Sequence, residues 1–423
     1  MEGYNKKVIM SYWTICRMKT TKKIYVKVSI IFLLGGILLF SSCEKEENQK
    51  IEANRKTLFM YLPWSSNLTN YFYNNISDLE KCITKIGLNN EKVIVFISTG
   101  STEAMMFEIV SSHGRCKREI LKKYKSPPFT TIDGITAILN DVKAFAPASV
   151  YTMIIGCHGM GWLPVYEMKV RSAPHMKMHW EYQGVPLTRY FGGLTAEYQT
   201  DIKSLASGIA NAGMKMEYIL FDDCYMSSIE VAYELKDVTK YLIGSTSEMM
   251  AYGMPYAAIG EYLLGNPDYQ SGCEEFYNFY STYEIMPCGT LAVTDCSELE
   301  NMAAIIKSIN SKYSFDKSLR GTIQRLDGYT PVIFYDFADY ITSLCNDPIL
   351  LNQFREQLNH LVPYKTHTKN FYTMAKGIIP INTFSGITTS DPSDNPMTVL
   401  KENTLWYKAC LLYTSPSPRD RQK

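Results

Sequence analysis

The chain has 423 residues, with 43 Lys and Arg against 42 Asp and Glu, which gives a formal net charge of +1. Hydrophobic residues make up 46% of the chain, which is enough for a sizeable core and too many for a disordered protein. Eleven cysteines in this length exclude a small disulfide scaffold, and the absence of any long basic stretch argues against nucleic acid as a partner.

The first 42 residues predict a bacterial signal peptide, for which Met18 is an alternative start. Lysines precede an uncharged run over 28–40, which is shorter than the roughly 20 apolar residues that a membrane-spanning helix needs. The run ends in Ser41-Ser42-Cys43, which resembles a lipobox in which Cys43 is acylated; an ordinary signal peptide with an incidental cysteine is the alternative. Acylation followed by an acidic linker over 43–56 predicts a lipid anchor in the bacterial envelope, at the outer membrane, facing the periplasm or the cell surface.

Apolar runs and helical periodicities then alternate along the chain. In chain order we predict a strand over 57–62, a helix over 71–86, strands over 92–98 and 104–110, a helix over 132–145, a strand over 150–156, a helix over 202–212, a strand over 218–221, a helix over 229–235, strands over 241–245 and 290–294, and a helix over 299–309. This alternation predicts an α/β fold with a mostly parallel sheet that helices cover on both faces. We delimit a domain over 57–310, an extension over 311–410 whose fold the patterns do not assign, and a disordered or non-native tail over 411–423.

Reactive side chains follow two of these strands. The strand over 150–156 leads into Cys157-His158-Gly159, and the strand over 218–221 leads into Asp222-Asp223-Cys224. Reactive residues collect at the carboxyl ends of parallel strands, and a cysteine nucleophile needs a base such as histidine. A glycine after the histidine permits a sharp turn and brings a backbone N–H close to a bound carbonyl group.

Each motif also has a structural interpretation. A His-Gly pair at a strand end is more often a turn than a catalyst, and a lone cysteine is usually a small buried hydrophobic residue. Cys157 is a second candidate for the nucleophile, although strand alternation places it on the opposite face from His158.

Taken together, His158-Gly159-Met160-Gly161-Trp162 and Asp222-Asp223-Cys224-Tyr225-Met226, with Gly244–Glu248 and Tyr252–Tyr256 beyond them, resemble the clostripain family of cysteine peptidases over about 57–265. The resemblance implies a caspase-like three-layer α/β/α sandwich. It also implies a cysteine endopeptidase that cleaves after Arg or Lys through an acyl-enzyme. His158 would then be the general base or acid, Cys224 the nucleophile, and the Gly159 and Cys224 amides the oxyanion hole.

The resemblance assigns further positions. Asp222 would lie in the S1 pocket and favour Arg or Lys at P1, Ser247 would contact substrate, and Lys169 and Arg171 are candidate sites of self-cleavage. It requires no cofactor for the chemistry and no metal site, although calcium dependence is known in the family.

Two positions depart from the family pattern. Asp223 stands where the family usually has a small residue, and its carboxylate would oppose thiolate formation if it pointed toward Cys224. Cys157 replaces a polar or acidic residue that is often found before the histidine.

Two alternatives stay open. A surface-binding lipoprotein could keep the fold and lose activity, although the intact His158–Cys224 pair argues against it. A cysteine amidase or transpeptidase on the same scaffold would differ in whether water or an amine resolves the acyl-enzyme.

The leader over 1–42 and the tail over 411–423 hold ten of the basic and two of the acidic residues, so 33 basic and 40 acidic residues remain over 43–410. A net negative body excludes nucleic acid more firmly and suits protein or peptide substrates with basic side chains.

Overall fold

The computed structural model describes residues 54–65, 68–157, 159–165, 184–186 and 198–410. Several predicted features lie outside the described residues: the signal peptide, Cys43, the acidic linker before residue 54, His158, Lys169, Arg171 and the tail over 411–423. Within the described ranges, no helix is both long and apolar enough to cross a membrane.

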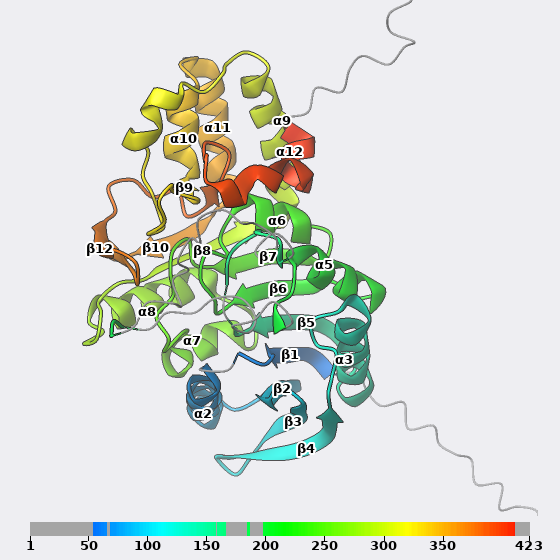
Figure 1. The fold of residues 1–423 in the computed structure, drawn as a ribbon. Coiled ribbons are helices and arrows are strands. Elements are labelled where there is room, and N and C mark those ends of the chain that lie inside the picture. The colour runs from blue at the N-terminus through cyan, green and yellow to red at the C-terminus, as the bar shows by residue number, and fades with distance from the viewer. Residues whose placement is uncertain (1–53, 66–67, 158, 166–183, 187–197, 411–423) are drawn as a thin grey trace, which may run out of the picture. The chain divides into compact units, whose positions relative to one another are not determined.

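A nine-stranded sheet forms the centre of the described part, in the order β10-β8-β7-β6-β5-β1-β2-β3-β4 (Figure 1). The strands are β1 (Asn54–Leu62), β2 (Glu91–Gly100), β3 (Glu103–Ser112), β4 (Arg115–Lys125), β5 (Ala148–Ile155), β6 (Met216–Phe221), β7 (Thr239–Gly244), β8 (Thr290–Asp295) and β10 (Tyr364–His367). Strands β2, β1, β5, β6 and β7 pair in parallel, and the strands outside them pair antiparallel. The predicted α/β class with a largely parallel sheet is therefore confirmed.

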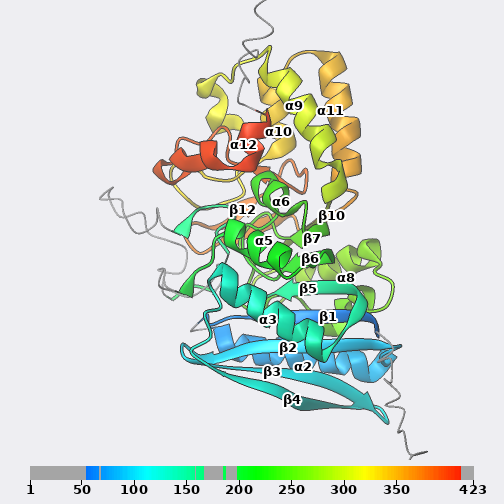
Figure 2. The ribbon, with the colours of Figure 1, turned by 90° about the vertical axis from the view of Figure 1, so that its right-hand side faces the viewer.

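The central strands are apolar on both faces because helices cover both faces of the sheet. The helices α2 (Thr69–Ile86), α7 (Tyr256–Leu263) and α8 (Tyr269–Ser281) pack along one face. The opposite face carries α3 (Ile132–Phe145), α5 (Ile202–Asn211) and α6 (Ile229–Leu235), which lie in front of the sheet in Figure 2. Each helix buries one stripe, as α2 does with Phe72, Ile76, Leu79 and Ile83. The result is a three-layer sandwich.

Residues beyond 310 belong to the same compact unit, which runs from residue 53 onward. Strand β10 extends the central sheet by pairing antiparallel with β8. From residue 296 onward, the other elements are α9 (Leu299–Asn310), α10 (Phe337–Leu344), α11 (Pro348–Leu361), α12 (Leu405–Cys410), the short strands β9 (Tyr335–Asp336), β11 (Asn370–Thr373), β12 (Gly377–Pro380) and β13 (Thr388–Thr389), and the 3₁₀ turns Cys296–Glu298, Lys317–Thr322 and Pro396–Asn403. The segment over 311–410, to which the sequence assigned no fold, thus completes the sheet and adds a helical layer beside α6.

Trp406 on α12 joins this layer to the rest of the core. Its side chain is fully buried, and its ring packs edge-on against Tyr233 of α6 at 5.7 Å and against Phe337 of α10 at 5.9 Å. Because the three rings come from three separate segments, Trp406 is a shared contact of the sandwich and the C-terminal helices.

We expect Trp406→Ala to lower the free energy of unfolding by about 3–5 kcal/mol, because it removes a large buried side chain and leaves a cavity. Urea denaturation followed by circular dichroism and by fluorescence should show one shifted transition. Ile349→Ala on α11, where the side chain is 70% exposed, is the control and should change stability little. Two separate transitions in Trp406→Ala would contradict a single folding unit.

Candidate active site

Cys224 lies in the loop that joins β6 to α6. The strand ends at Phe221, and Ser228 caps α6 by accepting the Val231 N–H at 3.2 Å, so the loop between them is short. The Cys224 side chain is buried, and its Sγ accepts the backbone N–H of Met249 at 3.1 Å. A hydrogen bond of this kind strengthens as sulfur gains negative charge, so the loop around Met249 can stabilise a thiolate.

The turn after Cys224 is held in an uncommon conformation. Tyr225 has a φ of +61°, a backbone angle that residues other than glycine seldom adopt. Its N–H donates to the Ser247 carbonyl at 3.0 Å, its hydroxyl donates to Glu248 Oε1 at 2.8 Å, and its ring stacks on Phe334 at 4.9 Å. Burial, together with the nearby Glu248 charge, raises the pKa of Tyr225 well above its usual value, so its hydroxyl keeps the proton that it donates. Three contacts therefore fix the turn that carries the cysteine.

Gly159 follows β5 and packs directly against the loop that carries Cys224. A Cβ atom on Gly159 would lie 2.2 Å from the Cys224 carbonyl oxygen and 2.9 Å from Asp223 Cβ. No side chain fits into this space. Because glycine has none, the two loops can meet backbone to backbone. Two residues on, Gly161 has a φ of +59°, and a Cβ there would meet the Phe334 ring at 2.9 Å. The chain after His158 is thus in contact with Cys224, as the sequence predicted for neighbouring strand ends.

The Asp223 carboxylate turns to the chain before His158. Its Oδ1 accepts the Cys157 backbone N–H at 2.6 Å, and its Oδ2 accepts the Cys157 thiol at 3.5 Å. Both residues are fully buried. A thiol that donates to a carboxylate is disfavoured as a thiolate, so this contact argues against Cys157 as the nucleophile.

Asp222 is buried at the other side of the loop. Its Oδ1 accepts the Met254 backbone N–H at 2.8 Å, and its Oδ2 accepts the Tyr256 hydroxyl at 2.9 Å. Both donors belong to the segment that begins α7, so Asp222 ties the loop after β6 to the chain over 254–256. A carboxylate has about four lone-pair sites, so these two bonds are compatible with a basic side chain binding as well.

The Ser247 hydroxyl is buried and lies 3.0 Å from Thr290 Oγ1 on β8. Ser245 Oγ lies 2.7 Å from the same Thr290 oxygen, so a cluster of hydroxyl groups joins β7 to β8 below the site. The Ser247 carbonyl accepts the Tyr225 N–H, as described above. Contact of Ser247 with substrate stays a prediction.

Residues beyond 310 complete the surroundings of the two loops, and sequence motifs gave no sign of this. Glu248 Oε2 accepts the Met374 N–H at 3.0 Å, and Trp162 Nε1 donates to Ser390 Oγ at 2.9 Å. Asp327 holds the loop that carries Phe334 by accepting the Tyr329 and Ile333 N–H groups at 2.7 and 2.8 Å. Burial raises the pKa of Asp327 to about 6, although these N–H donors act in the opposite direction.

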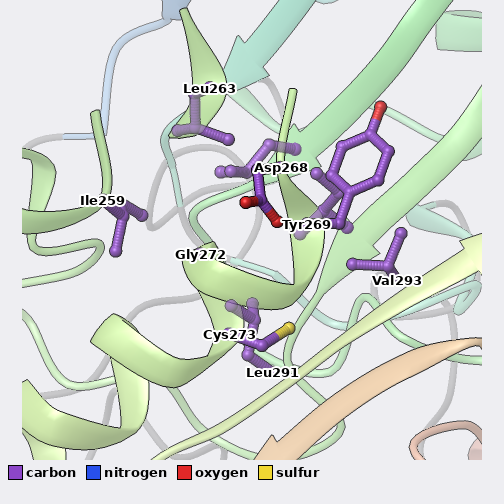
Figure 3. Close-up of a pocket in the computed structure, with 10 residues that line it drawn as sticks. Ile259, Leu263, Asp268, Tyr269, Gly272, Cys273, Leu291 and Val293 are labelled. Atoms are coloured by element: carbon purple, nitrogen blue, oxygen red, sulfur yellow. The ribbon is translucent and has the colours of Figure 1, made fainter. Parts of the chain in front are cut away.

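Two pockets lie away from these loops. A cavity of about 20 Å³, with room for about one water molecule, lies by α8. It is lined mainly by apolar side chains such as Ile259, Leu263 and Val293 (Figure 3). Another pocket lies near Arg55 and Glu91, at the amino-terminal ends of β1 and β2. Within the described ranges, no group of three or more His, Cys, Asp or Glu side chains is placed to hold a metal ion, so we assign no residue to calcium.

Comparison with known proteins agrees with this arrangement. The sequence profile of the clostripain family (Peptidase C11) matches residues 60–379. The chain belongs to the clostripain family of cysteine peptidases. No curated protein sequence matches it.

Several solved C11 structures resemble this peptidase. A secreted C11 cysteine protease from Bacteroides thetaiotaomicron, "iotapain", is 58% identical, with a TM-score of 0.79 over 85% of this chain and 99% of that one. A clostripain from B. thetaiotaomicron ATCC 29148, in complex with the peptide inhibitor BTN-VLTK-AOMK, is 65% identical, with a TM-score of 0.52 over 52% of this chain and 99% of that one. An inactive zymogen C11 protease from Parabacteroides distasonis is 24% identical, with a TM-score of 0.69 over 84% of this chain and 97% of that one, and shows the same fold.

In this clostripain-family peptidase, Glu230 connects α6 to the C-terminal segment. Its buried Oε1 accepts the Ser390 N–H at 2.7 Å and the Thr389 hydroxyl at 3.1 Å, and Ser390 also binds Trp162. The pKa of Glu230 is raised to about 7, mainly by burial and next by the charge of nearby Asp391. The hydrogen bond from the Ser390 N–H lowers this pKa by less than the Asp391 charge raises it. The protein therefore holds Glu230 protonated over a range in which the unfolded chain has released that proton.

A raised carboxyl pKa contributes stability that is full below about pH 4.5 and is lost as the pH rises toward 7. We expect the free energy of unfolding to fall by about 3 kcal/mol over this range through Glu230 and its coupling to Asp391. Glu230→Gln keeps the acceptor oxygen and should remove most of this decline. Chemical denaturation at a series of pH values measures it, with exposed Glu274→Gln as the control. An unchanged slope in Glu230→Gln would contradict the assignment.

Proposed function

We propose that this C11 peptidase cleaves peptide bonds after Arg or Lys with Cys224 as nucleophile and His158 as its acid–base partner. The observation that carries the proposal is the contact of Gly159 with the Cys224 backbone. It brings the ends of β5 and β6, and with them the two reactive sequences, to one point on the sheet. The Met249 N–H at the Cys224 sulfur adds support for thiolate chemistry at this point.

The chemistry follows from these positions. His158 takes the proton of Cys224, whose sulfur attacks the scissile carbonyl carbon and forms a tetrahedral oxyanion. The adjacent Gly159 and Cys224 amides would stabilise this oxyanion. The carbon–nitrogen bond then breaks as the imidazolium gives its proton to the leaving amine, which leaves a thioester on Cys224. Water, activated by His158, hydrolyses the thioester and restores the thiol.

The specificity for a basic P1 residue rests on Asp222. It is a buried carboxylate two residues before the nucleophile, held in place by the Met254 N–H and the Tyr256 hydroxyl. A fixed buried carboxylate recognises a guanidinium or ammonium group through strong charge-assisted hydrogen bonds. The peptide of the inhibitor bound to the B. thetaiotaomicron clostripain, VLTK, ends in a lysine, which agrees with a basic P1 residue.

The test uses fluorogenic peptide amides that differ only in Arg, Lys, Asp or Asn at P1. We expect hydrolysis after Arg and Lys alone, and loss of activity in Cys224→Ala. Asp222→Asn should lower kcat/KM on the basic substrates by at least about thirtyfold, because the ligand charge then lacks its buried partner. The exposed Asp316, which caps a 3₁₀ turn through the Ser318 N–H, provides the control variant Asp316→Asn.

Two outcomes would contradict this proposal. Full activity in Cys224→Ala would exclude the nucleophile, and a preference for Asp or Asn at P1 would exclude the role of Asp222. Activity of Asp316→Asn equal to that of the unmodified enzyme shows that the assay responds to position and not to the loss of any one carboxylate.

We further propose that the mature enzyme starts at an acylated Cys43 and that it cleaves itself after Lys169 or Arg171. The lipobox-like Ser41-Ser42-Cys43 supports the anchor in the bacterial envelope, and the 58% identical relative is described as secreted, which agrees with export. The two basic residues lie between the His158 and Cys224 sequences and suit the specificity proposed above.

Intact mass spectrometry of enzyme purified from membranes tests both proposals. We expect an N-terminal fragment that begins at Cys43 with the mass of its acyl chains and ends at Lys169 or Arg171. Cys224→Ala should give one uncut chain with the same N-terminus. Active enzyme with an uncut chain over 160–200 would contradict self-cleavage, and a Cys43 without added mass would contradict the anchor.

A further inference from the structure

One buried carboxylate contacts the chain on both sides of the predicted catalytic histidine. Asp223 Oδ1 accepts the Cys157 N–H at 2.6 Å, and its Oδ2 accepts the Cys157 thiol at 3.5 Å. On the other side of His158, Gly159 is so close that a Cβ atom there would lie 2.9 Å from Asp223 Cβ. His158 lies outside the described residues, but its two neighbours are both set against Asp223.

The bond to Cys157 begins where the sheet ends. The Asp222 N–H donates to the Ile155 carbonyl at 2.8 Å, and the Gly156 N–H donates to the Tyr61 carbonyl at 3.1 Å. These bonds still follow the pairing of β6, β5 and β1. The Cys157 N–H comes next, and it takes a side-chain acceptor from Asp223. A buried N–H without an acceptor would cost about 1–3 kcal/mol, so this bond fixes the path of the chain at the residue before His158.

The two residues of this hydrogen bond lie in the interior of the protein. Asp223 and Cys157 are fully buried, and Asp223 is joined by a peptide bond to Cys224. The carboxylate therefore links the main chain beside Cys224 to that of Cys157, the residue before His158. The carboxylate faces Cys157, which accounts for its presence so close to the nucleophile.

We propose that Asp223 is a positioning residue that sets the distance between His158 and Cys224 through the Cys157 backbone. This proposal rests on the proposed function, since it assumes that His158 exchanges protons with Cys224 and with the leaving group. In this role Asp223 acts on the histidine through the Cys157 backbone, which it binds at 2.6 Å. Its removal should therefore affect the step that depends on an accurately placed histidine and leave other steps in place.

Amide and ester substrates with the same Lys acyl group separate these steps. In acylation by an amide, the carbon–nitrogen bond breaks only as the nitrogen receives a proton from the histidine. In acylation by a p-nitrophenyl ester, the carbon–oxygen bond breaks and p-nitrophenolate leaves as an anion without that proton. Because kcat/KM reports the steps up to acylation, the ratio of the two values measures proton delivery to the leaving group.

We expect Asp223→Ala to lower kcat/KM on the amide by at least about thirtyfold and on the ester by only about threefold, since a misplaced acid–base group costs most where proton transfer is required. Asp223→Asn keeps the oxygen that accepts the Cys157 N–H and should stay within about fivefold of the unmodified enzyme on both substrates. Asp316→Ala, which removes an exposed carboxylate that also accepts a backbone N–H, is the control and should change neither value.

Other outcomes overturn the proposal. An equal fall on amide and ester in Asp223→Ala would indicate a general loss of folded enzyme, and no fall at all would show that Asp223 is dispensable. A loss in Asp223→Asn as large as in Asp223→Ala would exclude the hydrogen bond as the cause. If Asp223→Ala does not fold, as judged by circular dichroism, Asp223→Ser is judged by the same ratio, because its hydroxyl is one bond too short to replace the carboxylate. Cys224→Ala, measured in parallel, tests the proposed function by itself, and activity there would overturn both proposals.

Discussion

Two loops that leave the adjacent parallel strands β5 and β6 meet backbone to backbone at Gly159 and Cys224. A Cβ on Gly159 would lie 2.2 Å from the Cys224 carbonyl oxygen, so the approach exists only because glycine has no side chain. Parallel pairing of β5 with β6 brings the two strand ends to the same edge of the sheet. Phe334 packs beside this contact, since it stacks on the Tyr225 ring and fills the space next to Gly161.

Buried carboxylates take over where the strand ladder stops. A loop that leaves a sheet carries N–H groups with no strand partner, and each needs an acceptor when it is buried. Asp223 accepts from Cys157, Asp222 from Met254, and Glu248 from Met374. Each bond crosses from the region around Cys224 to a different segment. The same set of side chains thus satisfies buried backbone N–H groups and links the loops at this edge of the sheet to other segments.

The sequence predicted the sheet core and the reactive motifs, because both depend on neighbouring residues. Strands such as β1 and β5 are continuous apolar runs, and helices such as α2 repeat their buried residues with helical periodicity. It missed β4, whose many basic side chains lie on an edge strand that alternates between partly covered and exposed positions. It also could not predict β10, whose four residues form a strand only by pairing with β8, some seventy positions earlier. The sequence also could not predict the direction of the Asp223 side chain. The backbone and side-chain torsion angles of a single residue after a strand decide which loop that side chain contacts.

The long-range contacts of the C-terminal segment explain why the motifs alone do not make the site. A φ of +61° at Tyr225 costs of order 1–3 kcal/mol and persists only where the surroundings hold it. Among those surroundings, Phe334 stacks on the Tyr225 ring, and Met374 holds the Glu248 carboxylate that accepts the Tyr225 hydroxyl. Both come from beyond residue 310. Residues from beyond 310 therefore help to hold the turn that carries Cys224, so the motifs alone do not specify its conformation.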